Sequence, residues 1–180
     1  MQDVIATPFS LSQACVPALE VGLNALSGVL EAGARLAAEK DMAPAILLGW
    51  RLAPDMLPLI RQVQIAADLA KNGTARLADI KPPYFEDNET SIDHLKARLA
   101  RVVTFVQSVD RSRIDSAGER EITFPLGPDN KGCMKGDDYL MHFLLPNFHF
   151  HCTVAYAILR QCGADIGKSD YIGDIPITIT

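Results

Sequence analysis

The chain has 180 residues, of which 48% are hydrophobic and 22% are charged, and its formal net charge at pH 7 is −5. This length and composition are typical of one globular domain with its own core, so we expect a single domain over residues 1–180. The net negative charge, without a basic stripe along the chain, argues against a nucleic-acid partner, because phosphate binding needs an excess of Lys and Arg.

Two features of the chain bear on its location. Residues 1–4 carry neither the basic region nor the apolar run of a secretory signal, and no uninterrupted apolar run approaches the ~20 residues of a membrane-spanning helix. The four cysteines do not have the spacing of a disulfide framework, which is typical of reduced thiols. We therefore expect a cytoplasmic protein with no membrane partner.

The first predicted helix covers residues 10–39, where apolar residues recur near a 3.6-residue period. Pro17 lies within this range, so either the helix begins later, with Pro17 in its first turn, or a longer helix is kinked there. Pro44 and Gly49 indicate a turn after the helix.

The second predicted helix begins near residue 52 and ends at residues 71–73, where Asn-Gly is a common stop signal. Pro54 is tolerable in its first turn, whereas Pro58 predicts a kink or a later start. A crossing loop that reaches residue 84 follows.

The third predicted helix has Asn88 or Thr90 as its N-cap and ends near residue 109, with apolar residues repeating at three and four. Residues 120–124 then alternate polar and apolar, and residues 127–132 are rich in turn formers, which predicts a small β-hairpin. The fourth helix is expected over residues 137–162, with Gly163 capping its end. Four such helices predict an all-α antiparallel four-helix bundle, with the hairpin between the third and fourth helices.

A helical wheel of the fourth helix separates its two neighbouring histidines. At 100° per residue, His149 lies about 200° from His151, beside His142, so the two cannot share one ion. His151 falls near one edge of the inward apolar stripe, with Asn147 one turn earlier on the same edge. The predicted stripe contains Leu140, Met141, Leu144, Leu145, Phe148, Cys152, Ala155, Ile158, Leu159 and Cys162.

A single metal site on this helix therefore uses Asn147 with His151, or His142 with His149. We favour the first pair, because it faces the bundle interior, where bundles build cofactor sites. The alternative is that His151 is a core-edge histidine with a hydrogen bond to a neighbouring helix.

The second helix supplies candidate partners for this pair, because Asp55 and Gln62 flank its apolar stripe on one side. Asp55 could complete a site of one histidine and one carboxylate, or orient His151 by accepting its other N–H. The alternative for Asp55 is a first-turn carboxylate that the helix dipole favours. Together these observations predict a pocket lined by Asp55, Gln62, Asn147 and His151, with His151 and Asp55 as metal ligands.

Two further patterns are less specific. Residues 163–169 resemble a phosphate-binding loop, but three residues rather than four separate the glycines, and a helix precedes them. We reject that motif, although Lys168, Asp170 and Tyr171 could border the mouth of a pocket. Cys152 is adjacent to His151, but neighbouring helical residues point 100° apart, so a buried cysteine is favoured over a thiolate pair.

Several segments resemble a family of uncharacterised bacterial proteins that is similar to the DinB/YfiT-like superfamily of metal-dependent enzymes. They are LAPDMLPL at 52–59, RQVQ at 61–64, PNFHFH at 146–151, YAILR at 156–160 and GKSDY at 167–171. The resemblance covers nearly the whole chain. It implies an up-down-down-up four-helix bundle that is often a homodimer.

The same resemblance implies a divalent metal, often zinc or nickel, held by one histidine of the second helix and two at i,i+4 on the fourth. His151 matches the second histidine of that pair, and Asn147 stands where the first would be. The second helix has no histidine, and Asp55 is its nearest substitute.

These observations lead to two hypotheses of different classes. The first is a DinB-like enzyme that binds a small molecule at an altered metal site between helices two and four, with His151 as ligand or general base and Asp55 as ligand or orienting carboxylate. The alternative is a non-catalytic homo-oligomeric bundle whose pocket is vestigial.

Overall fold

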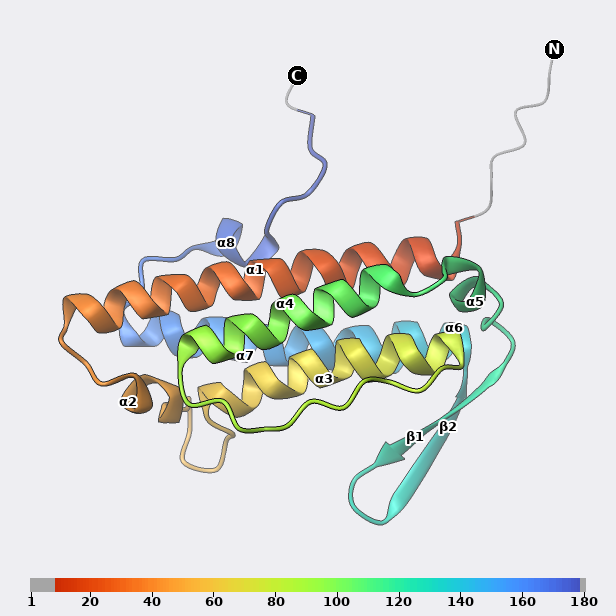
Figure 1. The fold of residues 1–180 in the computed structure, drawn as a ribbon, viewed down its shortest axis with the longest axis horizontal. Coiled ribbons are helices and arrows are strands. Elements are labelled where there is room, and N and C mark those ends of the chain that lie inside the picture. The colour runs from red at the N-terminus through yellow and green to blue at the C-terminus, as the bar shows by residue number, and fades with distance from the viewer. Residues whose placement is uncertain (1–8, 179–180) are drawn as a thin grey trace.

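The protein, described by a computed structural model over residues 9–178, is built on four long helices (Figure 1). These are α1 (Leu11–Glu39), α3 (Leu59–Ala78), α4 (Ile92–Ser108) and α7 (Leu145–Cys162). α1 packs against α4 and α7, and α3 packs against the same two helices. α1 and α7 run in one direction and α3 and α4 in the other (Figure 1). The predicted up-down-down-up bundle with a small hairpin is confirmed. Residues 1–4, on which the expectation about a secretory signal was based, lie outside the described residues.

α1 is the longest helix and has a well-defined start. The Ser10 hydroxyl accepts a hydrogen bond from the backbone N–H of Gln13, and the side-chain oxygen of Gln13 accepts one from the backbone N–H of Ser10. This reciprocal pair is a capping box. Pro17 lies inside the helix, so the longer of the two predicted helices is the correct one. α1 is long and apolar enough to cross a membrane, by length and composition alone. The core helix of a globular protein can have the same length and composition, and one face of α1 packs in this core.

α3 begins later and ends later than the sequence predicted. A short helix, α2 (Pro44–Gly49), precedes an irregular loop of residues 50–58, and Pro58 is the N-cap of α3. The predicted start near residue 52 is wrong because a proline disfavours the helical conformation in the residue before it. The predicted stop at residues 71–73 is also wrong. Gly73 lies inside α3, where its missing side chain leaves room for Leu144, and the helix continues to Ala78.

The loop of residues 79–91 returns along the bundle to the start of α4 (Figure 1). Ser91, rather than the predicted Asn88 or Thr90, is the N-cap of α4, and its hydroxyl accepts from the His94 amide at 3.1 Å. Arg98 of α4 is buried and ties this loop to α3. Its guanidinium contacts Asp68 and Glu89 at 2.9 Å and Asp87 at 3.0 Å.

The connection from α4 to α7 stays at one end of the bundle (Figure 1). It contains α5 (Arg111–Asp115) and the predicted hairpin of β1 (Glu121–Leu126) and β2 (Asn130–Lys135), which pair antiparallel. Phe124 of β1 is buried, with its ring centroid 4.2 Å from that of Phe143 and 5.1 Å from that of Tyr139. The hairpin is therefore attached to the bundle by aromatic packing.

The predicted fourth helix is one run of three parts: α6 (Gly136–Asp138), the π-helical segment η1 (Tyr139–Leu144) and α7. The Leu145 backbone N–H donates to the Leu140 carbonyl, five residues back, which is the π-helical pattern. The next residue, Pro146, has no N–H and cannot make an α-helical hydrogen bond. The wheel assumed a regular α-helix, so its prediction for Met141 is wrong, and this side chain is 54% exposed. Gly163 ends α7 in the left-handed conformation, as predicted.

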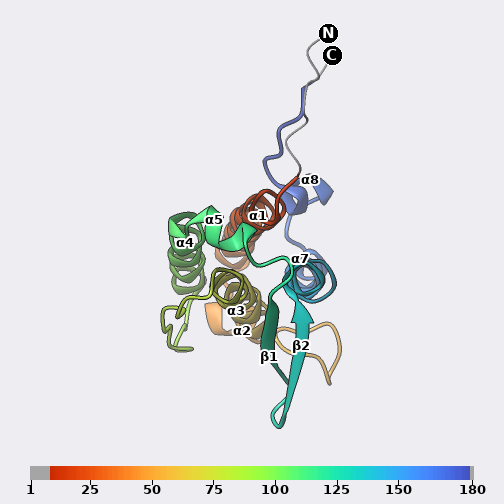
Figure 2. The same cartoon turned by 90° about the vertical axis from the view of Figure 1, so that its right-hand side faces the viewer.

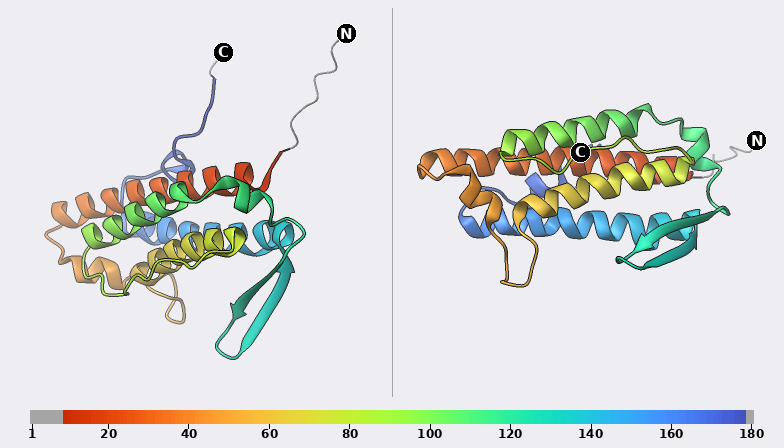
Figure 3. Two further views of the ribbon diagram at one scale, coloured as in Figure 1. Left: turned by 45° about the vertical axis from the view of Figure 1, so that its right-hand side comes forward. Right: turned by 60° about the horizontal axis from the view of Figure 1, so that its bottom comes forward.

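Two sides of the bundle differ in what covers them. α8 (Lys168–Ile172) packs against α1 and α7, and the C-terminal segment leaves the bundle on that side (Figure 2). On the other side, the loop of residues 50–58 and the hairpin lie near opposite ends of α7 (Figure 3). α7 therefore presents one face towards α1 and α8 and another towards α3.

Candidate functional site

α7 carries two histidines whose side chains have different neighbours. His149 lines a cavity formed with α1 and α8, whereas His151 contacts Gln62 of α3. Partial burial lowers the pKa of both imidazoles below the ordinary value, so the neutral form of each ring predominates at pH 7, although His149 keeps more contact with solvent than His151. The two side chains thus lie in two separate surroundings.

The first site is on the α3 side. The His151 Nδ1 atom lies 2.7 Å from Gln62 Oε1, and Gln62 Nε2 donates to the Leu57 carbonyl at 3.0 Å. Gln62 is 2% exposed and His151 is half-buried. This pair is the hydrogen bond between a core-edge histidine and a neighbouring helix that the sequence left open as an alternative.

Asn147 lies one turn before His151 on α7 and is half-buried. Its Nδ2 atom donates to the Phe143 carbonyl of the preceding turn at 2.6 Å. That carbonyl lies in the π-helical segment. The amide of Asn147 is therefore held by its own helix.

Asp55 does not lie where the sequence predicted it. It is exposed in the loop of residues 50–58, four residues before the first residue of α3, and not in a first helical turn. The prolines at 54 and 58 delay the start of the helix, which is the physical reason for the error. Gln62, rather than Asp55, contacts the His151 ring.

The residues of this site do not fit the zinc or nickel site that the resemblance implies. Within residues 9–178, no group of three or more His, Cys, Asp or Glu side chains is placed to hold a metal ion. His151 is paired with an amide, and Asn147 is bonded to its own helix. Amide groups are poor substitutes for the histidines of a tight zinc site.

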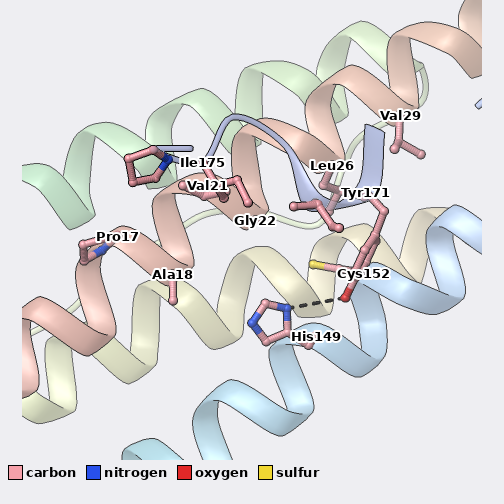
Figure 4. Close-up of a pocket in the computed structure, with 12 residues that line it drawn as sticks. Pro17, Ala18, Val21, Gly22, Leu26, Val29, His149, Cys152, Tyr171 and Ile175 are labelled. Carbon is pink, nitrogen blue, oxygen red and sulfur yellow. Dashed lines mark hydrogen bonds between the residues drawn. The ribbon is translucent and has the colours of Figure 1, made fainter. Parts of the chain in front are cut away.

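The second site is a cavity of about 380 Å³ between α1, α7 and α8 (Figure 4). None of the four predicted pocket residues lines it, whereas Tyr171, expected at a pocket mouth, does. Its twelve lining residues are Pro17, Ala18, Val21, Gly22, Leu26, Val29, His149, Cys152, Tyr171, Ile172, Ile175 and Pro176. The small and apolar residues of α1 were the signal for this cavity, but the α1 sequence alone does not show what faces them.

The polar groups of the cavity meet at one place. The Tyr171 hydroxyl accepts a hydrogen bond from the Thr153 hydroxyl at 2.9 Å and lies 3.5 Å from His149 Nδ1 (Figure 4). Burial raises the pKa of the Cys152 thiol to about 12, so this cysteine is a neutral wall residue, as the sequence favoured. At neutral pH the cavity wall is therefore uncharged.

Comparison with known proteins agrees with the bundle and its resemblance. The family model described as Domain of unknown function (DUF1993) matches residues 11–172. The chain belongs to the DUF1993 family. The crystal structure of a DinB family member protein from Shewanella denitrificans is also similar to it, with 33% sequence identity and a TM-score of 0.86. That match covers 94% of this chain and 96% of the other, and it confirms the DinB-like resemblance.

The comparison with curated proteins finds no match for this DUF1993 chain.

Proposed function

We propose that this DUF1993 protein binds a small, uncharged molecule with an apolar body in the cavity between α1, α7 and α8. The observation that carries the proposal is the cavity itself, about 380 Å³ in volume and walled almost entirely by apolar side chains. Ligand pockets in proteins have volumes of roughly 300–1,000 Å³ and combine an apolar wall with a few convergent polar groups. His149 and Tyr171 are those polar groups here.

The charge of the wall supports an uncharged ligand. The Cys152 thiol is neutral at pH 7, and burial lowers the pKa of His149, so its ring is neutral as well. A charged ligand would lose its hydration without gaining an ion pair, which costs free energy. A neutral ligand with one hydroxyl or carbonyl group near His149 has no such cost.

A neutral fluorescent probe tests this proposal. N-phenyl-1-naphthylamine should bind the parent protein with increased emission, and Ala18→Leu should weaken binding by about tenfold or more, because the added side chain fills the cavity. Ala38→Leu is the matched control, because Ala38 is exposed on the same helix, and it should leave binding unchanged. Equal binding by the parent and Ala18→Leu would refute the cavity as the binding site.

A second candidate function, assembly of two copies, is favoured by exposed apolar residues on one side of the bundle. Phe9 is 78% exposed and Ile177 is 69% exposed, and the start of α1 and the segment that follows α8 lie on the same side of the bundle (Figure 2). Large apolar side chains that are exposed to solvent can mark an interface. Light scattering after size-exclusion chromatography should give the mass of a dimer, and Ile177→Asp should reduce it to that of a monomer. A monomeric parent protein would exclude this candidate.

A further inference from the structure

We infer that Asn147 and His151 form a second binding site, in which two fixed hydrogen-bond acceptors take the ammonium group of a ligand. The site lies on the face of α7 towards α3, whereas the cavity lies on the face towards α1 and α8. It is independent of the cavity proposal, and either can fail without the other.

The hydrogen bonds of Gln62 fix the orientation of its side-chain amide. A backbone carbonyl can only accept, so the Gln62 NH₂ group must face the Leu57 carbonyl, 3.0 Å away, and Oε1 must face His151. Oε1 also only accepts, so the His151 Nδ1 atom, 2.7 Å from it, must carry the hydrogen. In the neutral ring, Nε2 then has a free lone pair. Gln62 is therefore a positioning residue that selects the tautomer of His151.

The side-chain amide of Asn147 has a fixed orientation as well. Its NH₂ group faces the Phe143 carbonyl at 2.6 Å, because that carbonyl can only accept. The remaining polar atom, Oδ1, is an acceptor. Asn147 and His151 are four residues apart on α7, so the two side chains project from the same face of the helix.

Both acceptor atoms are accessible. Within residues 9–178, neither Asn147 Oδ1 nor His151 Nε2 has a hydrogen-bond partner beyond those already described. Neither is among the buried polar atoms without a partner, which over the same residues are Thr74 Oγ1 and Arg98 Nε. Each of the two unpaired atoms therefore keeps some contact with solvent, and both residues are only half-buried.

The chemistry of this pair selects the ligand group. Because the site offers two acceptors, the ligand must supply at least two N–H or O–H donors, and a primary ammonium group has three. Phe150 is 56% exposed, its ring lies edge-on to the His151 ring at 5.3 Å, and it precedes His151 on α7. An exposed aromatic ring beside the site can contact a cation or the apolar substituent of an amine. The net charge of −5 also favours a cation over an anion.

The tautomer can be measured directly in the parent protein. At about pH 8, where imidazoles are neutral, the ¹⁵N chemical shifts of His151 should show a protonated Nδ1 and an unprotonated Nε2. Gln62→Leu should release the ring to the Nε2–H form that neutral imidazoles prefer in water. Gln64→Leu is the matched control: Gln64 is equally buried on α3 but contacts Arg61 and Glu89, so His151 should not change. A protonated Nε2 in the parent protein would overturn the inference.

Binding is tested with two benzyl cations of the same charge, of which only one carries N–H donors. Benzylamine, charged at this pH, should shift the amide resonances around Asn147 and His151 on titration, and benzyltrimethylammonium, which has no N–H, should bind at least about tenfold more weakly. Asn147→Leu and His151→Phe should each weaken benzylamine binding by about tenfold or more. Equal binding of the two cations, or unchanged binding in both variants, would show general attraction to a negatively charged protein and overturn the site.

Discussion

The two faces of α7 carry the same residue type, two positions apart, in opposite surroundings. On the α1 face, His149 lies beside an apolar cavity, and its polar contact is the Tyr171 hydroxyl at 3.5 Å. On the α3 face, His151 lies 2.7 Å from a buried amide that is itself anchored to the backbone. The difference between the cavity on one face and the hydrogen-bonded pair on the other therefore comes from the neighbouring helices and not from the histidines.

The origin of this difference is in the side chains of the packing helices. α1 presents Ala18 and Gly22 towards α7, and small residues leave a volume that the C-terminal segment encloses. α3 presents Gln62, which needs hydrogen-bond partners because it is buried. A cavity and a fixed polar pair are therefore two results of one helix packing against two different neighbours.

The largest expected loss of stability comes from replacing a core residue of α7. Phe148 is fully buried and packs against Gly22 of α1. Phe148→Ala should lower the free energy of unfolding by about 3–5 kcal/mol, through lost burial and the hole it leaves. Phe150→Ala, on the same helix but 56% exposed, should change it by no more than about 0.5 kcal/mol. Urea unfolding of both variants measures this, and similar values for the two would contradict the packing described.

The next effect concerns the α3 face alone. Gln62→Leu should lower the free energy of unfolding by about 1–3 kcal/mol, because the Leu57 carbonyl and the His151 ring each lose a partner. Binding of a neutral probe in the cavity should not change, because Gln62 does not line it. Thermal unfolding and probe titration on the same sample test both statements, and a loss of probe binding would show that the two faces are coupled.

Acid should destabilise the protein through both faces. Burial lowers the pKa of His149 and of His151 in the folded state, so the unfolded chain binds protons first as the pH falls. Their contribution is therefore present above the ordinary histidine pKa of about 6.5 and is lost as the pH falls towards the folded values. The free energy of unfolding between about pH 7.5 and pH 5.5 should decline less in His151→Phe than in the parent. Parallel curves would show that His151 does not contribute.

The smallest effect is expected at the mouth of the cavity. Tyr171→Phe removes a hydroxyl that bonds to the exposed Thr153, and water can replace that bond. The free energy of unfolding should therefore fall by no more than about 0.5–1 kcal/mol. Binding of the neutral probe should respond more strongly than stability, and the reverse order would argue that Tyr171 has only a structural role.

Much of the fold could be predicted from the sequence, because the apolar period of 3.6 residues and the turn formers act locally. The hairpin and the cap at Gly163 are where the local signals put them. The errors come from tertiary packing. Gly73 is a stop signal by its sequence context, but in the bundle it is the place where Leu144 approaches α3. Nothing in the sequence near Gly73 identifies that distant partner.

The candidate site could be predicted only in part, for a related reason. The wheel of α7 put His149 and His151 on different faces, and Gln62 was among the expected pocket residues. Which residue touches His151 depends on where α3 begins, and the prolines at 54 and 58 move that start past Asp55. The cavity was not predicted because its walls come from three separate segments.

Arg98 has a consequence for the order in which the bundle assembles. One guanidinium joins α4 to Asp68 on α3 and to Asp87 and Glu89 in the long connection between these helices. Those contacts can form only after both helices have docked, so the connection should become ordered late in folding and detach as a unit when α4 opens. Amide hydrogens of residues 86–89 should then exchange with solvent together with those of α4, as one cooperative segment.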